Sequence, residues 1–121
     1  MIGAGGLRGA YDTGVVAELC RNLGPDYFDA IYACSAGAYA AAHFVLNQPD
    51  SEEYIWRNLL DGNKFINLFN PLQRRNILDL EYLIDILKHP DTLLHIENLP
   101  QIRTRLIYTL TDQKTGQSVY F

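Results

Sequence analysis

Ser35 stands in a pattern that serine-based acyl transfer requires. Residues 28–42 consist of a short apolar run, a serine between small residues, and an alanine-rich segment of high helix propensity. This is the strand–turn–helix layout of a nucleophile elbow, in which a sharp turn makes the serine Oγ project. The elbow needs small residues two positions before and after the serine, and Ala33 and Gly37 stand there. The alternative is a serine that caps an ordinary helix.

A glycine-rich segment, residues 3–9, lies upstream of this serine. Gly3, Gly5 and Gly6 allow several backbone N–H groups to point outward together, as in an anion-binding nest. Arg8 adds a positive charge beside them. The dinucleotide-binding fingerprint fits this segment poorly, because Arg8 occupies the position of its third glycine. An ordinary strand-to-helix loop is the alternative.

The spacing of apolar residues indicates which elements position these two segments. It predicts helices over 10–23, 36–46, 52–60 and 79–88, and strands over 28–33, 105–111 and 118–121. The first 47 residues form two strand–turn–helix units, which predict an α/β fold with a mainly parallel sheet flanked by helices.

Two details of these elements can be tested against a structure. The first helix is expected to bury Val15, Val16, Leu19 and Leu23. Gly14 within it costs about 1 kcal/mol relative to alanine, so we expect another backbone to approach closely there. The apolar residues of 65–72 are expected either to pack on the core or to line an apolar groove.

Composition narrows the class of protein further. The chain has 121 residues, of which 48% are hydrophobic and 20% charged, so a single globular domain is expected. A net charge of −4 gives no reason to expect nucleic-acid binding. The sequence contains neither a membrane-span-length apolar run nor a signal-peptide layout, which favours a cytoplasmic location. Cys20 and Cys34 lack metal-ligand spacing, and we expect both to be reduced.

The glycine-rich segment and the elbow together resemble the N-terminal half of a patatin-like phospholipase domain, particularly its bacterial branch. That family carries Gly-Gly-Gly-x-Arg-Gly at the first turn and Gly-x-Ser-x-Gly at the elbow, in this order. Thr-Asp-x-x-Thr-Gly at 111–116 is similar to the family's strand before its second catalytic element. The resemblance implies an apparently incomplete three-layer α/β architecture related to the α/β hydrolases. It implies one partial domain over 1–121, with an oxyanion loop at 3–9, a nucleophile elbow at 33–37, a helical insertion at about 50–102 and a strand hairpin at 105–121.

The same resemblance implies a serine acyl hydrolase acting on lipid or ester substrates. Ser35 would be the nucleophile of a Ser–Asp dyad, and the N–H groups around Gly5 and Gly6, with Arg8 nearby, would form the oxyanion hole. The other positions carried over from the motifs are Gly3, Gly9, Ala33 and Gly37. The family uses no metal, cofactor or catalytic histidine, so His43 is interpreted as a packing or surface residue. A lipid substrate is also compatible with peripheral contact between the protein and a membrane.

The sequence departs from the family pattern in one respect that bears on activity. The family's catalytic aspartate lies in an Asp-Gly-Gly/Ala motif, which these 121 residues do not contain; their one Asp-Gly, at 61–62, has the wrong neighbours and order. We therefore expect little or no turnover from the chain alone, because a serine without a base keeps its proton. A truncated sheet would also expose an unpaired edge at 105–121, so self-association or disorder is expected there.

Three alternatives stay open at the level of the sequence. One is a non-catalytic binding module with the same fold. Another is a phosphate- or nucleotide-binding α/β domain that uses residues 3–9 as an anion nest. An acyl-carrier transacylase is a weaker alternative, because such elbows usually have histidine where Cys34 stands.

Overall fold

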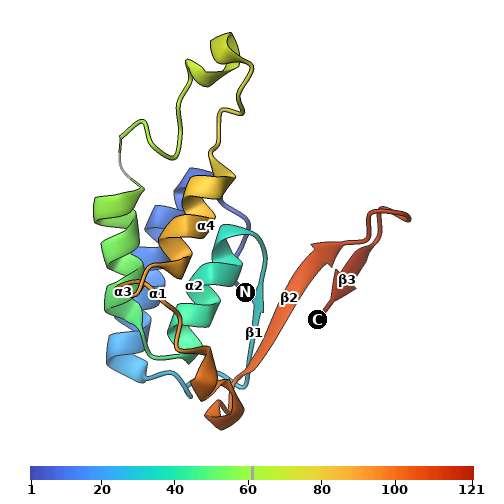
Figure 1. Cartoon of the computed structure of the whole chain (residues 1–121). Helices are drawn as coiled ribbons and strands as arrows, with labels where there is room; N and C mark the ends of the chain where they lie inside the picture. Colours follow the sequence, from blue (N-terminus) through green and yellow to red (C-terminus); the bar gives the residue numbers. More distant parts are fainter. Residues whose placement is uncertain (61) are drawn as a thin grey trace.

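A computed structural model describes residues 1–60 and 62–121, so the first residue of the Asp-Gly pair at 61–62 lies outside the described residues. The chain alternates helices with a small sheet (Figure 1). The helices are α1 (Gly9–Leu23), α2 (Ala36–Val45), α3 (Pro49–Tyr54) and α4 (Leu80–Lys88), and the strands are β1 (Ala30–Ala33), β2 (Arg105–Thr111) and β3 (Ser118–Tyr120). Short 3₁₀ turns occupy Gly6–Arg8, Asn70–Gln73 and Ile96–Gln101, and a π-helical turn, Ile55–Leu59, continues α3.

The sheet has the order β1-β2-β3 and is mixed. β1 and β2 are parallel, with Ala30 opposite Arg105, and β2 and β3 are antiparallel. On the other edge of β1 the N-terminal residues add a single parallel bridge. There the Ile2 N–H donates to the Tyr32 carbonyl at 2.8 Å, and the Cys34 N–H donates to the Ile2 carbonyl at 3.3 Å. The predicted α/β class is confirmed, and the residues before the glycine-rich segment contribute only this bridge to the sheet.

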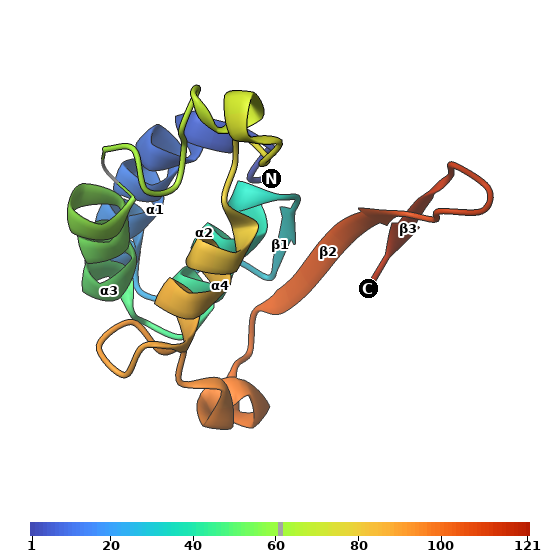
Figure 2. The ribbon, with the colours of Figure 1, turned by 45° about the horizontal axis from the view of Figure 1, so that its top comes forward.

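The helices gather on one side of the sheet in both ribbon views (Figures 1 and 2). Ile31 and Ala33 of β1 are buried on the helical side, whereas Tyr32 between them is 45% exposed. This alternation follows from the period-2 geometry of a strand. The described part of the chain therefore forms two layers of the predicted three-layer arrangement.

The buried face of α1 differs from the predicted one. Of the four apolar residues expected inside, only Val16 is buried, and Val15, Leu19 and Leu23 are partly exposed. Instead, α1 packs on α2 and α3 through smaller side chains: Gly9, Thr13, Val16, Ala17 and Cys20.

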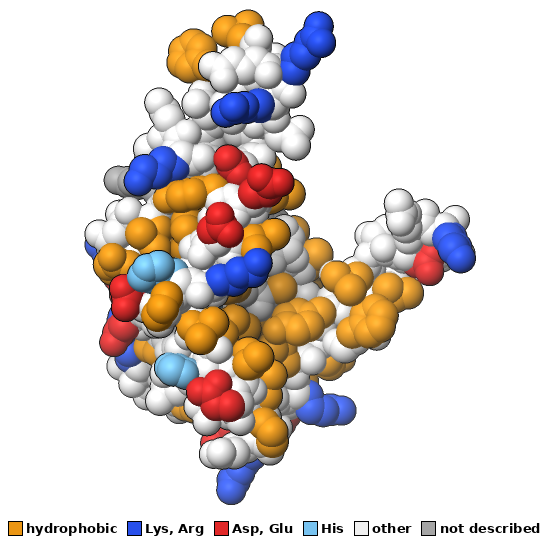
Figure 3. All heavy atoms as spheres, in the orientation of Figure 1, with side chains coloured by type: hydrophobic (Ala, Val, Ile, Leu, Met, Phe, Trp, Pro, Cys, Tyr) orange, Lys and Arg blue, Asp and Glu red, His pale blue; other side chains and the backbone are white. Residues whose placement is uncertain are grey.

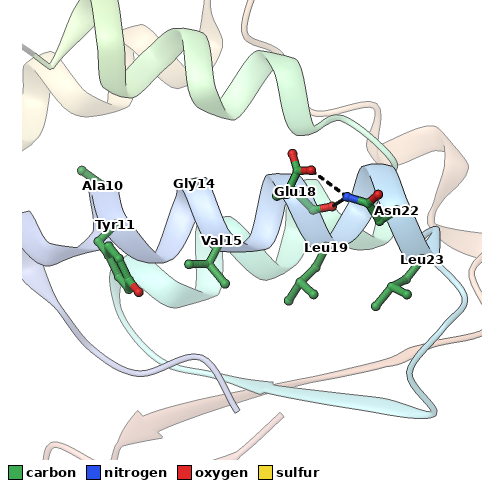
Figure 4. A pocket seen from close by; sticks show the side chains of 8 residues that line it. All are labelled: Ala10, Tyr11, Gly14, Val15, Glu18, Leu19, Asn22 and Leu23. Carbon is green, nitrogen blue, oxygen red and sulfur yellow. Dashed lines mark hydrogen bonds between the residues drawn. The ribbon is translucent and has the colours of Figure 1, made fainter.

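The three partly exposed residues form a stripe with Tyr11 along the outer side of α1, where they line a groove of about 630 Å³ (Figure 4). The spacing of apolar residues predicted an apolar stripe on α1, but it did not show which side of α1 the neighbouring helices cover.

Gly14 also differs from its expectation, because a Cβ built there meets no atom within 4 Å. The close approach occurs one and a half turns earlier in the helix. A Cβ at Gly9 would lie 2.9 Å from both Ala36 Cβ and Trp56 Cζ2. Gly9 thus lets the start of α1 rest against the start of α2 and the π-helical turn.

Most element boundaries agree with the sequence to within three residues. The helix expected from residue 52 begins at Pro49, consistent with the preference of proline for the first helical turn. The β2–β3 hairpin turns at Asp112, whose Oδ1 accepts the N–H groups of Lys114 and Thr115 at 2.8 and 2.7 Å. An Asx turn of this kind is specified by residues within the turn itself.

Candidate active site

Ser35 lies in a strained turn between β1 and α2. Its φ of 54° and ψ of −128° place a non-glycine residue in a sparsely populated backbone region. An N-cap serine normally has an extended backbone and accepts a hydrogen bond from the first helical turn, but the Ser35 side chain makes no capping bond. The turn therefore has the geometry of a nucleophile elbow and not that of an ordinary helix cap.

Gly37 shows why the elbow needs a glycine two residues after the serine. A Cβ at this position would lie 2.7 Å from the carbonyl oxygen of Gly3 and 2.8 Å from that of Ile2. Both distances are shorter than real Cβ contacts, and the obstructing atoms belong to the backbone. The first residues of the glycine-rich segment therefore lie directly against the elbow, so that the two sequence motifs meet in space.

The glycine-rich segment presents backbone N–H groups beside Ser35. Gly6 has a φ of 53° and begins the 3₁₀ turn, in which the Arg8 N–H donates to the Gly5 carbonyl at 3.0 Å. The first residues of a helical turn have no partner within it, so the N–H groups of Gly6 and Leu7 are not used by the turn. Both residues line the same cavity as Ser35. Ala36, the first residue of α2, lines it as well.

The structure separates the predicted oxyanion-hole residues. It brings Gly6 to the cavity of Ser35, whereas Arg8 is exposed and is not one of the residues that line the cavity. Gly5 shapes the turn, since a Cβ there would lie 3.0 Å from the Gly9 nitrogen. Ala33, which replaces a family glycine, is buried at the end of β1 and pairs with Ile2.

Ser35 opens into a large apolar cavity of about 940 Å³. Its walls come from the glycine-rich segment, the elbow helix, the π-helical turn, the segment before α4, α4 itself and β2. The residues lining it are Gly6, Leu7, Ser35, Ala36, Ala38, Tyr39, Ala42, Ile55, Trp56, Leu60, Phe65, Ile66, Ile77, Leu78, Leu80, Leu83, Leu87, Leu94 and Tyr108. The described lining residues include no Asp or Glu. The cavity can take up an aliphatic chain whose reacting end lies at Ser35.

Several walls of this cavity were missed or only partly predicted from the sequence. Within 65–72, Phe65 and Ile66 line the cavity, but Leu68, Phe69 and Leu72 are exposed and are not among its lining residues. On α4, the apolar stripe was detectable from its spacing, but not the fact that its leucines face the elbow. No feature of the sequence near Tyr108 predicted its place in the cavity wall, because the parallel pairing of β2 with β1 brings this residue there.

A buried polar cluster lies behind the elbow helix, where α1, α2 and α3 meet. Thr13 donates to Glu52 Oε1 at 2.7 Å, and His43 Nδ1 lies 3.1 Å from the Tyr39 carbonyl oxygen. Three further buried atoms in the described residues have no hydrogen-bond partner: Tyr39 Oη, His43 Nε2 and Glu52 Oε2. Burial raises the pKa of Glu52 to about 7 and lowers that of His43 to about 4. His43 is fully buried, which agrees with its interpretation as a packing residue.

Residues 1–60 and 62–121 contain neither a cluster of metal-ligating side chains nor a membrane-spanning helix. No three or more His, Cys, Asp or Glu side chains gather closely enough to hold a metal ion. None of the helices in that part of the chain is both long enough and apolar enough to cross a membrane. Cys20 and Cys34 are free thiols, and burial raises the pKa of Cys20.

A serine in a strained turn at the end of a parallel strand, against a glycine-rich turn, gives this α/β fold the layout of a nucleophile elbow. Comparison with protein-family models matches residues 1–118 to the patatin-like phospholipases, and the chain belongs to that family. At the level of the family this means lipid acyl hydrolases. Curated proteins and solved structures gave no match to the chain.

Proposed function

We propose that Ser35 is the nucleophile of a lipid acyl hydrolase. The observation that carries the proposal is the position of Ser35, which stands in a strained turn at the mouth of an apolar cavity of about 940 Å³. A lipid acyl chain in this cavity would have its ester carbonyl beside the Oγ. Attack of the Oγ on the ester carbonyl would form a tetrahedral intermediate. Its collapse would break the ester C–O bond, release the alcohol and leave an acyl-enzyme, which water hydrolyses to the free fatty acid and Ser35.

The N–H groups of Gly6, Leu7 and Ala36 are the proposed oxyanion donors. They come from the first residues of two helical turns, where N–H groups point out of the helix and favour negative charge. Each such donor contributes about 3–4 kcal/mol to the stability of the transition state in comparable sites. This assignment keeps Gly6 from the sequence prediction, replaces Gly5 by Leu7, and gives Arg8 no direct role.

The proton acceptor is the missing part of this site. The described residues that line the cavity offer no carboxylate, and His43 is buried in the cluster behind the elbow helix. We therefore expect the 121-residue chain to bind acyl chains but to turn them over slowly. A Ser–Asp dyad would need an aspartate from outside these lining residues.

Release of p-nitrophenolate from p-nitrophenyl esters tests the proposal. We expect a slow release that is faster for a dodecanoyl than for an acetyl ester, because the longer chain fills the cavity. The Ser35→Ala variant should lose this release. An equal rate in Ser35→Ala, for either ester, would remove Ser35 from the chemistry.

A non-catalytic binding module is the second candidate, favoured by the lack of a carboxylate at the described cavity walls. It predicts that the chain binds long-chain fatty acids with equal affinity whether residue 35 is serine or alanine, and that no Ser35-dependent ester cleavage occurs. The two measurements together separate the candidates.

A further inference from the structure

Residues 67–76, here called the tip segment, project from the molecule beyond the cavity. Figure 1 shows them at the top of the view, between the π-helical turn and α4. Two short flanking pairs, 65–66 and 77–78, form a stem beneath the tip. The Asp79 N–H donates to the Phe65 carbonyl at 2.9 Å, the Asn67 N–H donates to the Ile77 carbonyl at 3.0 Å, and Ile66 pairs with Leu78.

The tip segment is a built loop in which the side chains of Asn67 and Asn70 hydrogen-bond to the loop's own backbone. Asn67 Oδ1 accepts the Phe69 N–H at 2.9 Å, and Asn70 Nδ2 donates to the Asn76 carbonyl at 2.9 Å. Asn70 also accepts the Arg75 N–H on its carbonyl at 3.0 Å. The asparagines thus satisfy the backbone of the loop, and the apolar side chains are left for the outside.

Three large apolar side chains stand on the outer surface of the tip. Leu68 is 74% exposed, Phe69 69% and Leu72 84%. Surface leucines are ordinary when scattered singly, but three within five residues on one projecting turn form a patch that water solvates poorly. Figure 3 shows hydrophobic and basic side chains together on this projection.

The charge of this region is opposite to that of the rest of the chain. Residues 62–78 contain three basic residues, Lys64, Arg74 and Arg75, and no acidic residue. Seven of the ten basic residues and all fourteen acidic residues lie elsewhere. In the described part of the chain, the ion pairs involve none of these three cations.

We propose that the tip segment docks on the surface of an anionic lipid bilayer. Its apolar side chains enter the interface between headgroups and acyl chains, and its cations lie at the level of the anionic headgroups. An acidic protein partner would match the charge but would not explain three apolar side chains on the outermost turn. The acidic surface of a second copy of this chain would likewise match the charge, but it does not explain the three apolar side chains either.

The stem connects this surface to the proposed active site. Phe65, Ile66, Ile77 and Leu78 line the cavity that also contains Ser35. A bilayer held at the tip therefore lies next to one wall of the cavity. This link rests on the proposed function, since it gives the cavity a lipid substrate, whereas docking itself requires no chemistry at Ser35.

Co-sedimentation with vesicles tests the docking surface, and the Ser35→Ala background keeps its result independent of hydrolysis. Vesicles of phosphatidylcholine alone are compared with vesicles that also contain phosphatidylserine. We expect binding to the anionic vesicles that weakens with added salt. The Arg74→Gln/Arg75→Gln variant should bind them about fivefold more weakly per charge removed. The control Arg103→Gln/Lys114→Gln removes two exposed charges elsewhere and should bind like the parent.

The apolar contribution is tested in the same way. Leu68→Ser/Phe69→Ser should weaken binding by at least about tenfold, because two side chains no longer enter the interface. Ile96→Ser/Leu99→Ser, which changes exposed residues on another turn, should have no such effect.

Binding that is absent, or equal in the tip and control variants, would overturn the proposal. So would a dimer in sedimentation velocity that only the tip variants dissociate, because that result would assign the patch to a second copy. If Ser35→Ala loses ester cleavage but still binds the anionic vesicles, the result supports Ser35 as the nucleophile and the tip segment as a docking surface that does not depend on it.

Discussion

Replacing Glu52 or His43 should reveal two opposite pH dependences of stability that cancel in the wild-type chain. Both side chains are buried at the junction of α1, α2 and α3, and they face Thr13, Tyr39 and each other's helices. Burial raises the pKa of Glu52 from 4.5 to about 7, so the folded state holds its proton more tightly than the unfolded state. Burial lowers the pKa of His43 from 6.5 to about 4, so the folded state resists its protonation.

The signs follow from linkage. The stability contributed by Glu52 is fully present below its unfolded pKa and is lost as the pH rises through about 7. That contributed by His43 is fully present above its unfolded pKa and is lost as the pH falls through about 4. Between about pH 5 and about pH 7, the Glu52 contribution falls by about 2 kcal/mol and the His43 contribution rises by about 2 kcal/mol. The raised pKa values of Tyr39 and Cys20 keep both groups neutral in this range.

Urea unfolding at a series of pH values measures these slopes. The free energy of unfolding of Glu52→Gln should rise by about 2 kcal/mol from about pH 5 to about pH 7, and that of His43→Asn should fall by about 2 kcal/mol. In the wild-type chain the contributions of Glu52 and His43 cancel, so this pair should change its free energy of unfolding little over the same pH range. Glu81→Gln, which alters an exposed carboxylate on α4, is the control and should keep the wild-type profile. If the free energy of unfolding changes with pH in the same direction in Glu52→Gln and His43→Asn, the raised pKa of Glu52 and the lowered pKa of His43 are refuted.

Three further predictions concern the elbow, the cavity and the hairpin. Gly37→Ala should lower the free energy of unfolding by about 1–3 kcal/mol in urea, because its methyl group meets backbone carbonyls; Gly14→Ala faces open space and should raise it by up to about 1 kcal/mol. Equal shifts in the two variants would contradict the packing described at the elbow. Leu83→Glu should weaken binding of a fluorescent fatty acid at least about tenfold by placing a charge in the apolar cavity, while Ile84→Glu, one residue further on the partly exposed side of α4, should not. Residues 109–121, which lie beyond the part of β2 that pairs with β1, should exchange amide hydrogens rapidly or should be protected only as the chain self-associates with concentration; a monomer with slow exchange there would count against an available edge.

The elbow could be predicted from the sequence because its constraints are local. A serine between small residues, after an apolar run and before an alanine-rich helix, specifies the turn from neighbouring residues alone. The hairpin was predictable for the same reason, since Asp112 and Gly116 determine its turn within six residues.

The buried face of α1 and the cavity could not be predicted, because both depend on contacts between distant segments. The stripe of Tyr11, Val15 and Leu19 has the helical spacing of a core face, yet α2 and α3 pack on the adjacent side, where small residues allow close approach. Likewise, Leu83 and Tyr108 line the same cavity as Ser35 only after α4 has folded back over the elbow helix and β2 has paired with β1.

The central claim, that Ser35 is a displayed nucleophile beside oxyanion donors and an acyl cavity, is tested most directly by a long-chain alkyl fluorophosphonate. The chain contains three serines, Ser35, Ser51 and Ser118, so two of them serve as controls within the same molecule. Peptide mass mapping over time should find the adduct at Ser35, formed more than about 100-fold faster than at the other two because the donors stabilise its transition state. Ser35→Ala should remove it. Equal labelling of the three serines, or an adduct that survives in Ser35→Ala, would contradict the account.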